Sequence, residues 1–178
     1  GHEFVDLGLP SGALWATMNI GATSPEKTGN KYAWGETTTK STYNWKTYQF
    51  CTFYTNSSLY YMNKYSRRSG QGDWKTVLEL VDDAARVNWG GQWKMPTSGN
   101  FEELCEKCTW TLTTLNGTNV YKVTGPNGHS IYLPATKYWS CILGDYEEQA
   151  YCLSVSNNSG VTSVNRCADL AIRPICFK

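Results

Sequence analysis

Three short apolar runs separated by turn sequences constrain the fold more than any other feature of this chain. The runs are Trp110–Leu112, Val120–Val123 and Ile131–Pro134. Asn116-Gly117 separates the first two, and a Gly-Pro-Asn-Gly turn separates the last two. Asn-Gly suits a tight hairpin because both residues tolerate the positive φ angles that such a turn requires. The pattern therefore predicts an antiparallel meander.

A first helix is predicted before this meander. An apolar run from Val77 to Val81 leads into residues 82–89, where Asp82 and Asp83 are placed to cap the start of a helix. Gly90-Gly91 then ends it.

A second helix is predicted to start at Thr97, a good N-cap residue. Asn100 stands where a capping box would have Glu or Gln, so only a partial cap is expected. The apolar side of this helix has helical spacing and consists of Phe101, Leu104, Cys105 and Cys108.

The N-terminal part reads as strands joined by a tight turn. Apolar residues between Phe4 and Leu9 and between Leu14 and Ile20 flank Pro10, which presets its own φ, and Gly12, which accepts a positive φ. Pairing of these strands with the C-terminal ones would give an α+β fold.

Residues 37–72 are polar and rich in aromatic residues, with little regular period. A structureless segment of this length is uncommon in a compact domain unless it packs as an ordered loop. Disordered segments are poor in aromatic residues, so we expect an ordered, loop-rich insertion.

Length and charge limit the classes of function. At 178 residues the chain fits one domain, 1–178. A net charge of +1 and the lack of a basic run exclude a surface that tracks phosphates, so no nucleic-acid partner is expected. No segment has the roughly 20 apolar residues of a membrane span, so no membrane insertion by this domain is expected.

Residues 138–177 carry the mixture of side chains that points to function. Tyr151, Leu153 and Val155 alternate with Cys152 and Ser154, which is the period of a half-buried strand. Leu153 and Val155 are expected to face the core, and Cys152 and Ser154 to face outward. Thiols, carboxylates, an aromatic ring and a guanidinium are mixed in this stretch, which is typical of a displayed surface rather than of a catalytic site.

Several short motifs occur in order along nearly the whole chain. They are FVDLGLPSG (4–12), LWA (14–16), AWGET (33–37), DAA (83–85), NWG (88–90), WKMPT (93–97), FEEL (101–104), YWS (138–140) and IRPI (172–175). Together they resemble the Fibrobacter succinogenes major paralogous domain. That domain is similar to the C-type lectin-like fold of variable proteins diversified by retroelements.

The resemblance implies a C-type lectin-like fold with two short helices, antiparallel sheets and long ordered loops. It also implies a variable, ligand-binding region at about 138–176, in which a reverse transcriptase rewrites adenine-bearing codons. The YWS and IRPI motifs would be its fixed borders. The ligand would be a protein or glycan on a cell or phage surface. The residues expected to contact it are Cys141, Ile142, Leu143, Asp145, Tyr146, Glu147, Glu148, Tyr151, Cys152, Ser154, Arg166, Cys167 and Asp169.

The same resemblance implies an extracellular, cell-surface or virion-surface location, including that of a lipoprotein whose leader has been removed. The calcium-binding motifs of sugar-binding C-type lectins are missing from the sequence, so neither a metal nor a cofactor is expected. A fixed adhesin domain without diversification is the main alternative.

Other classes of site have weaker support in the sequence. A thiol oxidase related to formylglycine-generating enzymes would use Cys141 and Cys152, but no His or Lys stands beside either thiol in sequence. With seven cysteines, at least one has no disulfide partner within the monomer. The single C-x-x-C pair, Cys105 and Cys108, is interpreted as two small buried thiols on one helix face. Glu79, Asp82 and Asp83 read as cap residues rather than metal ligands, and the tryptophans near the helices as core. We therefore expect no enzymatic activity.

Overall fold

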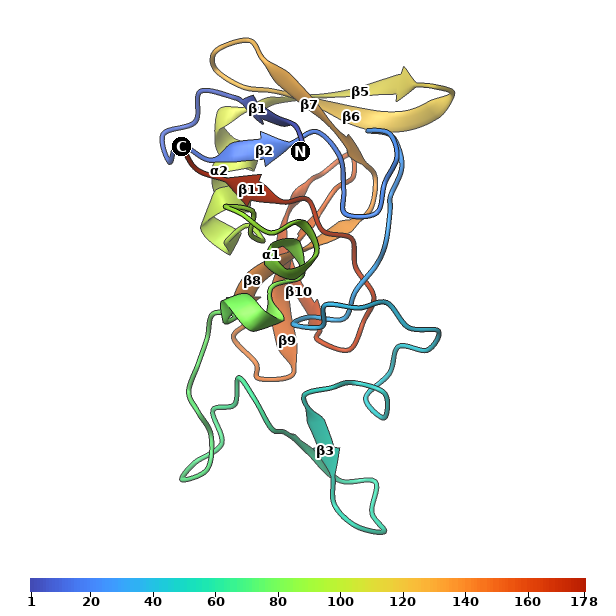
Figure 1. Ribbon diagram of the computed structural model, residues 1–178, viewed down its shortest axis with the longest axis vertical. Helices are drawn as coiled ribbons and strands as arrows, with labels where there is room; N and C mark the ends of the chain where they lie inside the picture. The colour runs from blue at the N-terminus through green and yellow to red at the C-terminus, as the bar shows by residue number, and fades with distance from the viewer.

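The computed structural model describes all residues from 1 to 178 and contains two α-helices and four small antiparallel sheets (Figure 1). The predicted α+β class is thus confirmed. The elements in chain order are β1 (Phe4–Asp6), β2 (Leu14–Ala16), β3 (Cys51–Phe53), β4 (Tyr60–Met62), the 3₁₀ turn η1 (Leu80–Asp82), α1 (Ala84–Trp89), α2 (Ser98–Lys107), β5 (Thr109–Leu115), β6 (Thr118–Thr124), β7 (Ser130–Pro134), β8 (Lys137–Leu143), β9 (Gln149–Ser154), β10 (Gly160–Asn165) and β11 (Ile175–Cys176).

The two ends of the chain meet in one sheet, as predicted. Strand β2 lies between β1 and β11, and Trp15 pairs with Val5 on one side and Ile175 on the other. The turn between β1 and β2 is closed by the Gly12 N–H, which donates to the Leu9 carbonyl at 3.0 Å. Gly12 has a φ of 75°, which explains the glycine at this position.

The predicted meander is also confirmed. Strands β5, β6 and β7 pair in sequence order, and the β5–β6 turn consists of Asn116 and Gly117 with φ angles of 49° and 79°. Both angles are positive, as a type I′ hairpin requires. The hairpin extends beyond the body of the protein at the top of Figure 1, with β5 outermost.

Both predicted helices form, with two differences at their starts. The first is divided: η1 comes before Asp83, whose carboxylate accepts from the Arg86 N–H at 3.0 Å and caps α1. The second starts after Thr97 with a complete capping box, because the Asn100 side chain accepts from the Thr97 N–H at 2.9 Å. The expectation of a partial cap was wrong, since a short amide oxygen reaches this N–H as a longer Glu or Gln would.

The sheet β10-β9-β8 lies between two hydrophobic cores. Trp139 and Cys152 belong to the larger core on one face, whereas Tyr138 and Leu153 belong to the core that contains α2 residues on the other. The sequence analysis did not predict β10, although its Val161 and Val164 are typical strand residues.

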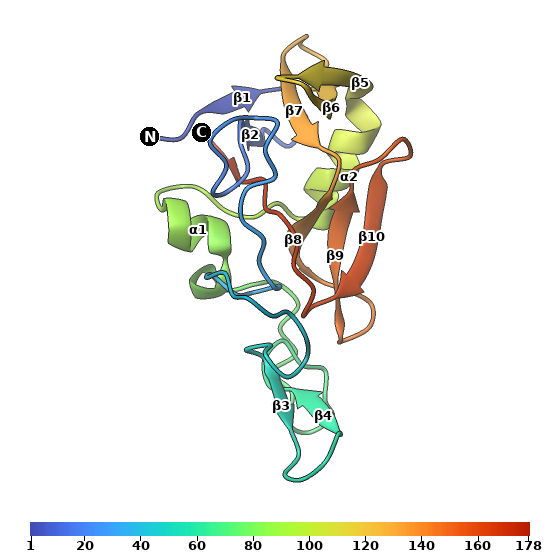
Figure 2. The ribbon, with the colours of Figure 1, turned by 90° about the vertical axis from the view of Figure 1, so that its right-hand side faces the viewer.

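Residues 37–72 form an ordered, loop-rich insertion, as predicted. Its only regular element is the short β3–β4 pair at the lower end of Figure 2. Aromatic rings fill the loops: Trp45 stacks on Tyr60 with ring centroids 5.4 Å apart, and Tyr48, Phe50 and Tyr65 are buried in the larger core. Burial of these rings orders a segment that has little secondary structure.

Candidate ligand-binding surface

Five of the residues predicted to contact a ligand are buried. Their exposed fractions are 7% for Cys141, 2% for Leu143, 0% for Cys152, 0% for Arg166 and 8% for Cys167. The prediction that they form a contact surface is wrong for this structure. Each packs in the larger core or beside it, because residues of the insertion, of the first helix and of the segment around Trp34 cover the face of the sheet that was expected to face solvent.

Arg166 holds the insertion against the C-terminal sheet. Its Nε donates to the Tyr48 hydroxyl at 3.0 Å, and its terminal nitrogens donate to the carbonyls of Lys64 at 2.8 Å and of Tyr65 and Glu147 at 3.1 Å. The guanidinium also lies over the Trp34 ring, 4.9 Å from its centroid. These contacts satisfy a buried cation that has no carboxylate partner, so Arg166 is a structural residue.

The residues predicted as framework borders are buried as expected. Trp139 donates from Nε1 to the Tyr32 carbonyl at 2.7 Å, and the Tyr138 hydroxyl donates to the Pro134 carbonyl at 2.8 Å. At the other border, Arg173 is fully buried and donates to the Asn19 side chain at 2.7 Å. Burial lowers the pKa of Arg173 to about 10.

The exposed members of the predicted surface gather in the β8–β9 loop, residues 144–148. Asp145, Tyr146 and Glu148 are exposed, and Tyr146 has 72% of its surface accessible. Outside this loop only Asp169 is fully exposed. The remaining predicted contacts are half-buried: Ile142, Glu147, Tyr151 and Ser154.

Arg67 from the insertion fixes the base of the β8–β9 loop. Its guanidinium donates to the carbonyl of Gly144 at 2.8 Å and to that of Asp145 at 3.0 Å. Its backbone N–H donates to the Glu147 carboxylate. On the strand side, the Tyr151 hydroxyl donates to Asp145 Oδ1 at 2.6 Å, and this hydrogen bond raises the pKa of Tyr151.

The insertion also exposes aromatic residues, and they were not among the predicted contacts. Tyr54 and Tyr60 are 43% and 38% exposed, and Leu59 is 67% exposed. Partial burial raises the pKa of Tyr60, with a smaller contribution from the Glu148 carboxylate. The aromatic composition of residues 37–72 was the signal that could have identified them.

The thiols proposed for oxidase chemistry lie in an unsuitable environment. Burial raises the pKa of Cys141 to about 12 and that of Cys152 to about 11. Reactive cysteines need a lowered pKa and access to solvent. All seven cysteines are free thiols, including Cys105 and Cys108 at the end of α2.

The acidic residues near the first helix have structural partners. Asp82 accepts from Lys64 Nζ and from the Tyr65 hydroxyl, both at 2.6 Å, and Asp83 accepts from the Met95 N–H at 2.9 Å. No group of three or more His, Cys, Asp or Glu side chains is arranged to hold a metal ion. None of the helices has the length and apolar character needed to cross a membrane.

Trp34, from one of the motifs weighed as a sugar-stacking platform, lies in the core. It is completely buried, and its Nε1 donates to the Ser140 carbonyl at 2.8 Å. Trp93 is also buried, whereas Trp89 is half-buried and stacks on His2 with ring centroids 3.7 Å apart.

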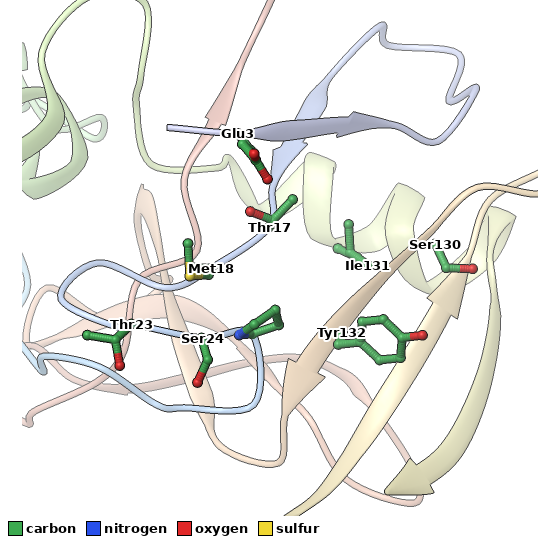
Figure 3. Close-up of a pocket in the computed structure, with 9 residues that line it drawn as sticks. Glu3, Thr17, Met18, Thr23, Ser24, Ser130, Ile131 and Tyr132 are labelled. Atoms are coloured by element: carbon green, nitrogen blue, oxygen red, sulfur yellow. The ribbon is translucent and has the colours of Figure 1, made fainter. Parts of the chain in front are cut away.

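A pocket of about 390 Å³ lies between the segment that follows β2 and strand β7 (Figure 3). Glu3, Thr17 and Met18 line one side, and Ser130 and Tyr132 of β7 line the other. The lining offers hydroxyl groups and one carboxylate, without the paired titratable groups of a general acid–base site. It contains none of the residues predicted to bind a ligand.

Comparisons of the chain with protein-family models, with curated proteins and with solved structures found no match.

Proposed function

We propose that this chain is a ligand-binding domain with a C-type lectin-like scaffold that displays diversified side chains, as a target of a diversity-generating retroelement. The display surface consists of the β8–β9 loop and the exposed aromatic residues of the insertion. The borders of the diversified region are the buried YWS and IRPI motifs. No chemistry is assigned to the surface.

The observation that carries this proposal is the exposure of Tyr146 on a loop with a fixed base. Tyr146 has 72% of its surface accessible, while Arg67 and Tyr151 hydrogen-bond the loop on two sides. A large aromatic side chain held by a rigid backbone loses little conformational entropy on binding. Tyrosine is also among the residues that most often dominate the binding energy of an interface.

The chemistry of the surface favours a macromolecular ligand. The β8–β9 loop exposes Tyr146 and Glu148, and the insertion exposes the aromatic and aliphatic side chains of Tyr54, Leu59 and Tyr60. Such a mixture matches protein–protein interfaces, in which buried aromatic anchors are surrounded by polar groups. A glycan that stacks on the tyrosine rings is the other ligand class that this surface suits.

The arrangement of the elements supports a C-type lectin-like scaffold. The terminal strands pair in one sheet, two helices lie between the N-terminal strands and the meander in chain order, and a separate sheet carries the region expected to vary. The motifs that carry the family resemblance also include buried core residues such as Trp15, Trp34 and Met95.

Binding is tested by screening the purified domain on protein and glycan arrays. For any ligand found, Tyr146→Ala should weaken binding by about 30-fold or more, as expected for an anchor residue worth about 2 kcal/mol. The control is Phe4→Ala on β1, which removes an aromatic side chain of 50% exposure outside the proposed surface. Equal effects of the two substitutions would contradict the assignment of the surface.

Diversification is tested separately by sequencing the DNA around the coding region. We expect a near-identical template repeat that differs at adenines, together with a reverse-transcriptase gene. If both are missing, the domain is a fixed protein- or carbohydrate-binding adhesin, and only the diversification part of the proposal fails. An extracellular, cell-surface or virion-surface location belongs to the same proposal and is tested by surface labelling of the native protein.

A further inference from the structure

Strand β5 is an open edge of its sheet. It pairs with β6 on one side, and no other strand pairs with its opposite side. In Figures 1 and 2 β5 lies near the top of the molecule, at the far end from the insertion. An open strand edge presents unpaired backbone donors and acceptors to any chain that can add a further strand.

The turn defines which backbone groups of β5 face outward. Leu115 and Thr118 flank the two-residue Asn116-Gly117 turn and therefore form a hydrogen-bonded pair. The N–H and C=O groups of Leu115 thus point toward β6. Alternation along the strand then directs the N–H and C=O groups of Trp110, Leu112 and Thr114 to the open side. None of these three residues forms a backbone hydrogen bond outside the regular strand pairing.

The side chains of β5 do not protect this edge. Its sequence, TWTLTTL, has no charge, no proline and no glycine over seven residues. No residue of the strand is buried, and Leu112 at its centre is 59% exposed. Natural edge strands are usually shortened, bulged or supplied with charges to prevent pairing, and β5 has none of these features.

The other edge strands differ from β5. Strands β1, β3 and β4 are only three residues long. Strand β10 has six residues, but it begins at a glycine, and its Val161 and Val164 pack against the two cores. Of the remaining edge strands, β7 ends in a proline, β8 begins with a lysine and β11 has two buried residues. Strand β5 is therefore the longest edge strand that has neither a charge nor a proline and no buried residue.

The strand is complementary to itself when it pairs antiparallel across a two-fold axis centred on Leu112. In that register Leu112 lies opposite Leu112 of the other copy, Thr111 opposite Thr113, and Trp110 opposite Thr114. The outward backbone groups of Trp110, Leu112 and Thr114 then match one another and supply roughly six hydrogen bonds. Thr–Thr and apolar cross-strand pairs are favourable, and no charged side chain of β5 meets its own copy.

We infer that β5 is a homodimer interface at which a second copy of this chain adds its own β5, forming a continuous sheet of six strands. We favour a second copy over another protein because a second β5 has the same seven-residue length, the same spacing of outward backbone groups and no charged side chain. Such an edge-to-edge contact is small, so the dimer forms reversibly and depends on concentration.

The mass of the intact chain in solution tests the inference. Sedimentation equilibrium from about 5 to about 500 µM should show the mass rising from 20.0 kDa toward twice that value. Leu112→Lys places two ammonium groups opposite each other at the axis and should weaken dimerisation at least 10-fold. The matched control, Thr162→Lys on the edge strand β10, should leave the dissociation constant unchanged.

Crosslinking tests the register. Leu112→Cys places two thiols on opposite residues of a pair, where Cα atoms lie about 5.5 Å apart, a distance that a disulfide spans. Mild oxidation should give a covalent dimer in which the two copies are joined by a disulfide at position 112, identified by peptide mass spectrometry. Thr113→Cys, which would face Thr111 of the other copy, should crosslink much less.

Three outcomes would overturn the inference. One is a monomer over the whole concentration range. The second is equal loss of dimer in the β5 and β10 lysine variants. The third is efficient crosslinking only at Thr113→Cys, which would assign another register and contradict the pairing of Leu112 with its own copy. Circular dichroism of each variant confirms that it is folded.

Discussion

Cys152 and Tyr146 belong to one stretch that the sequence analysis assigned to a displayed surface, yet they differ completely in their exposure to solvent. Cys152 is completely buried in the middle of β9, whereas Tyr146 is 72% exposed in the β8–β9 loop. The sheet that contains Cys152 has a hydrophobic core on each face. The loop extends beyond the end of that sheet, where neither core covers it.

The comparison shows that strand alternation identifies two faces but not what covers them. Leu153 and Val155 face one core as predicted, but Cys152, on the opposite face, meets the core that the insertion completes. A one-sided sheet would have exposed it. The region therefore divides into a buried half that supports the fold and an exposed half in and around the β8–β9 loop.

The largest effect is expected from a charge in the buried half. Cys152→Asp places a carboxylate without a partner in the core and should cost about 4 kcal/mol or more of unfolding free energy, or prevent folding. Ser154→Asp, two residues along the same strand and half-buried, should cost about 1 kcal/mol or less. Urea unfolding followed by circular dichroism measures both. Similar losses for the two variants would show that the division between the halves is wrong.

The next largest effect is expected at the contact between the sheet and the insertion. Arg166→Leu leaves the Tyr48 hydroxyl and the carbonyls of Lys64 and Tyr65 without this donor and should cost roughly 3 kcal/mol. Limited proteolysis of this variant should cut within residues 37–72 first. Asp169→Asn, an exposed control, should change neither quantity; unchanged proteolysis in Arg166→Leu would contradict the anchoring role.

A pH-dependent effect is expected from Cys141. Burial raises its pKa to about 12 from an ordinary value of 9.0, so between these values the folded state keeps a proton that the unfolded state releases. The folded state then binds more protons, and a rising pH favours unfolding. Near pH 11 this contributes a loss of about 2.6 kcal/mol relative to pH 8. Cys141→Ala should show a smaller decrease over the same range; an identical decrease would contradict the burial of this thiol.

The smallest effect is expected in the exposed half. Tyr151→Phe removes the hydrogen bond to Asp145 and should cost about 0.5 to 1 kcal/mol, with faster hydrogen exchange of the amides in the β8–β9 loop. Tyr121→Phe removes a half-buried hydroxyl that has no hydrogen-bond partner in the chain and should leave the exchange of this loop unchanged. Equal exchange in both variants would show that Tyr151 does not order the loop.

Local signals predicted most of the elements correctly. The Asn116-Gly117 turn, the Thr97 cap and the Gly90 stop each depend on the conformations available to a few neighbouring residues, and the structure contains all three features. The sequence analysis missed β10, because polar residues separate its two valines and no apolar alternation marks it as a strand. It forms by pairing with β9.

The candidate surface was harder to predict, because exposure depends on contacts between distant segments. The burial of Arg166 follows from Tyr48, more than a hundred positions away, and from the insertion loops around it. A guanidinium within a stretch of mixed side chains gives no local sign that aromatic rings will enclose it. The aromatic composition of residues 37–72 was evidence that this segment packs. The composition did not indicate which face of the C-terminal sheet these rings would cover.

The most direct test of this account is a saturation library over positions 141–169, selected for folded protein by surface display and sequencing. We expect broad tolerance at the exposed positions Asp145, Tyr146, Glu148 and Asp169. At the buried positions Cys141, Leu143, Cys152 and Cys167 we expect selection against polar and charged substitutions, and at Arg166 we expect selection for the arginine itself. Equal tolerance at the two sets of positions would contradict the division of this region into a supporting half and a displayed half.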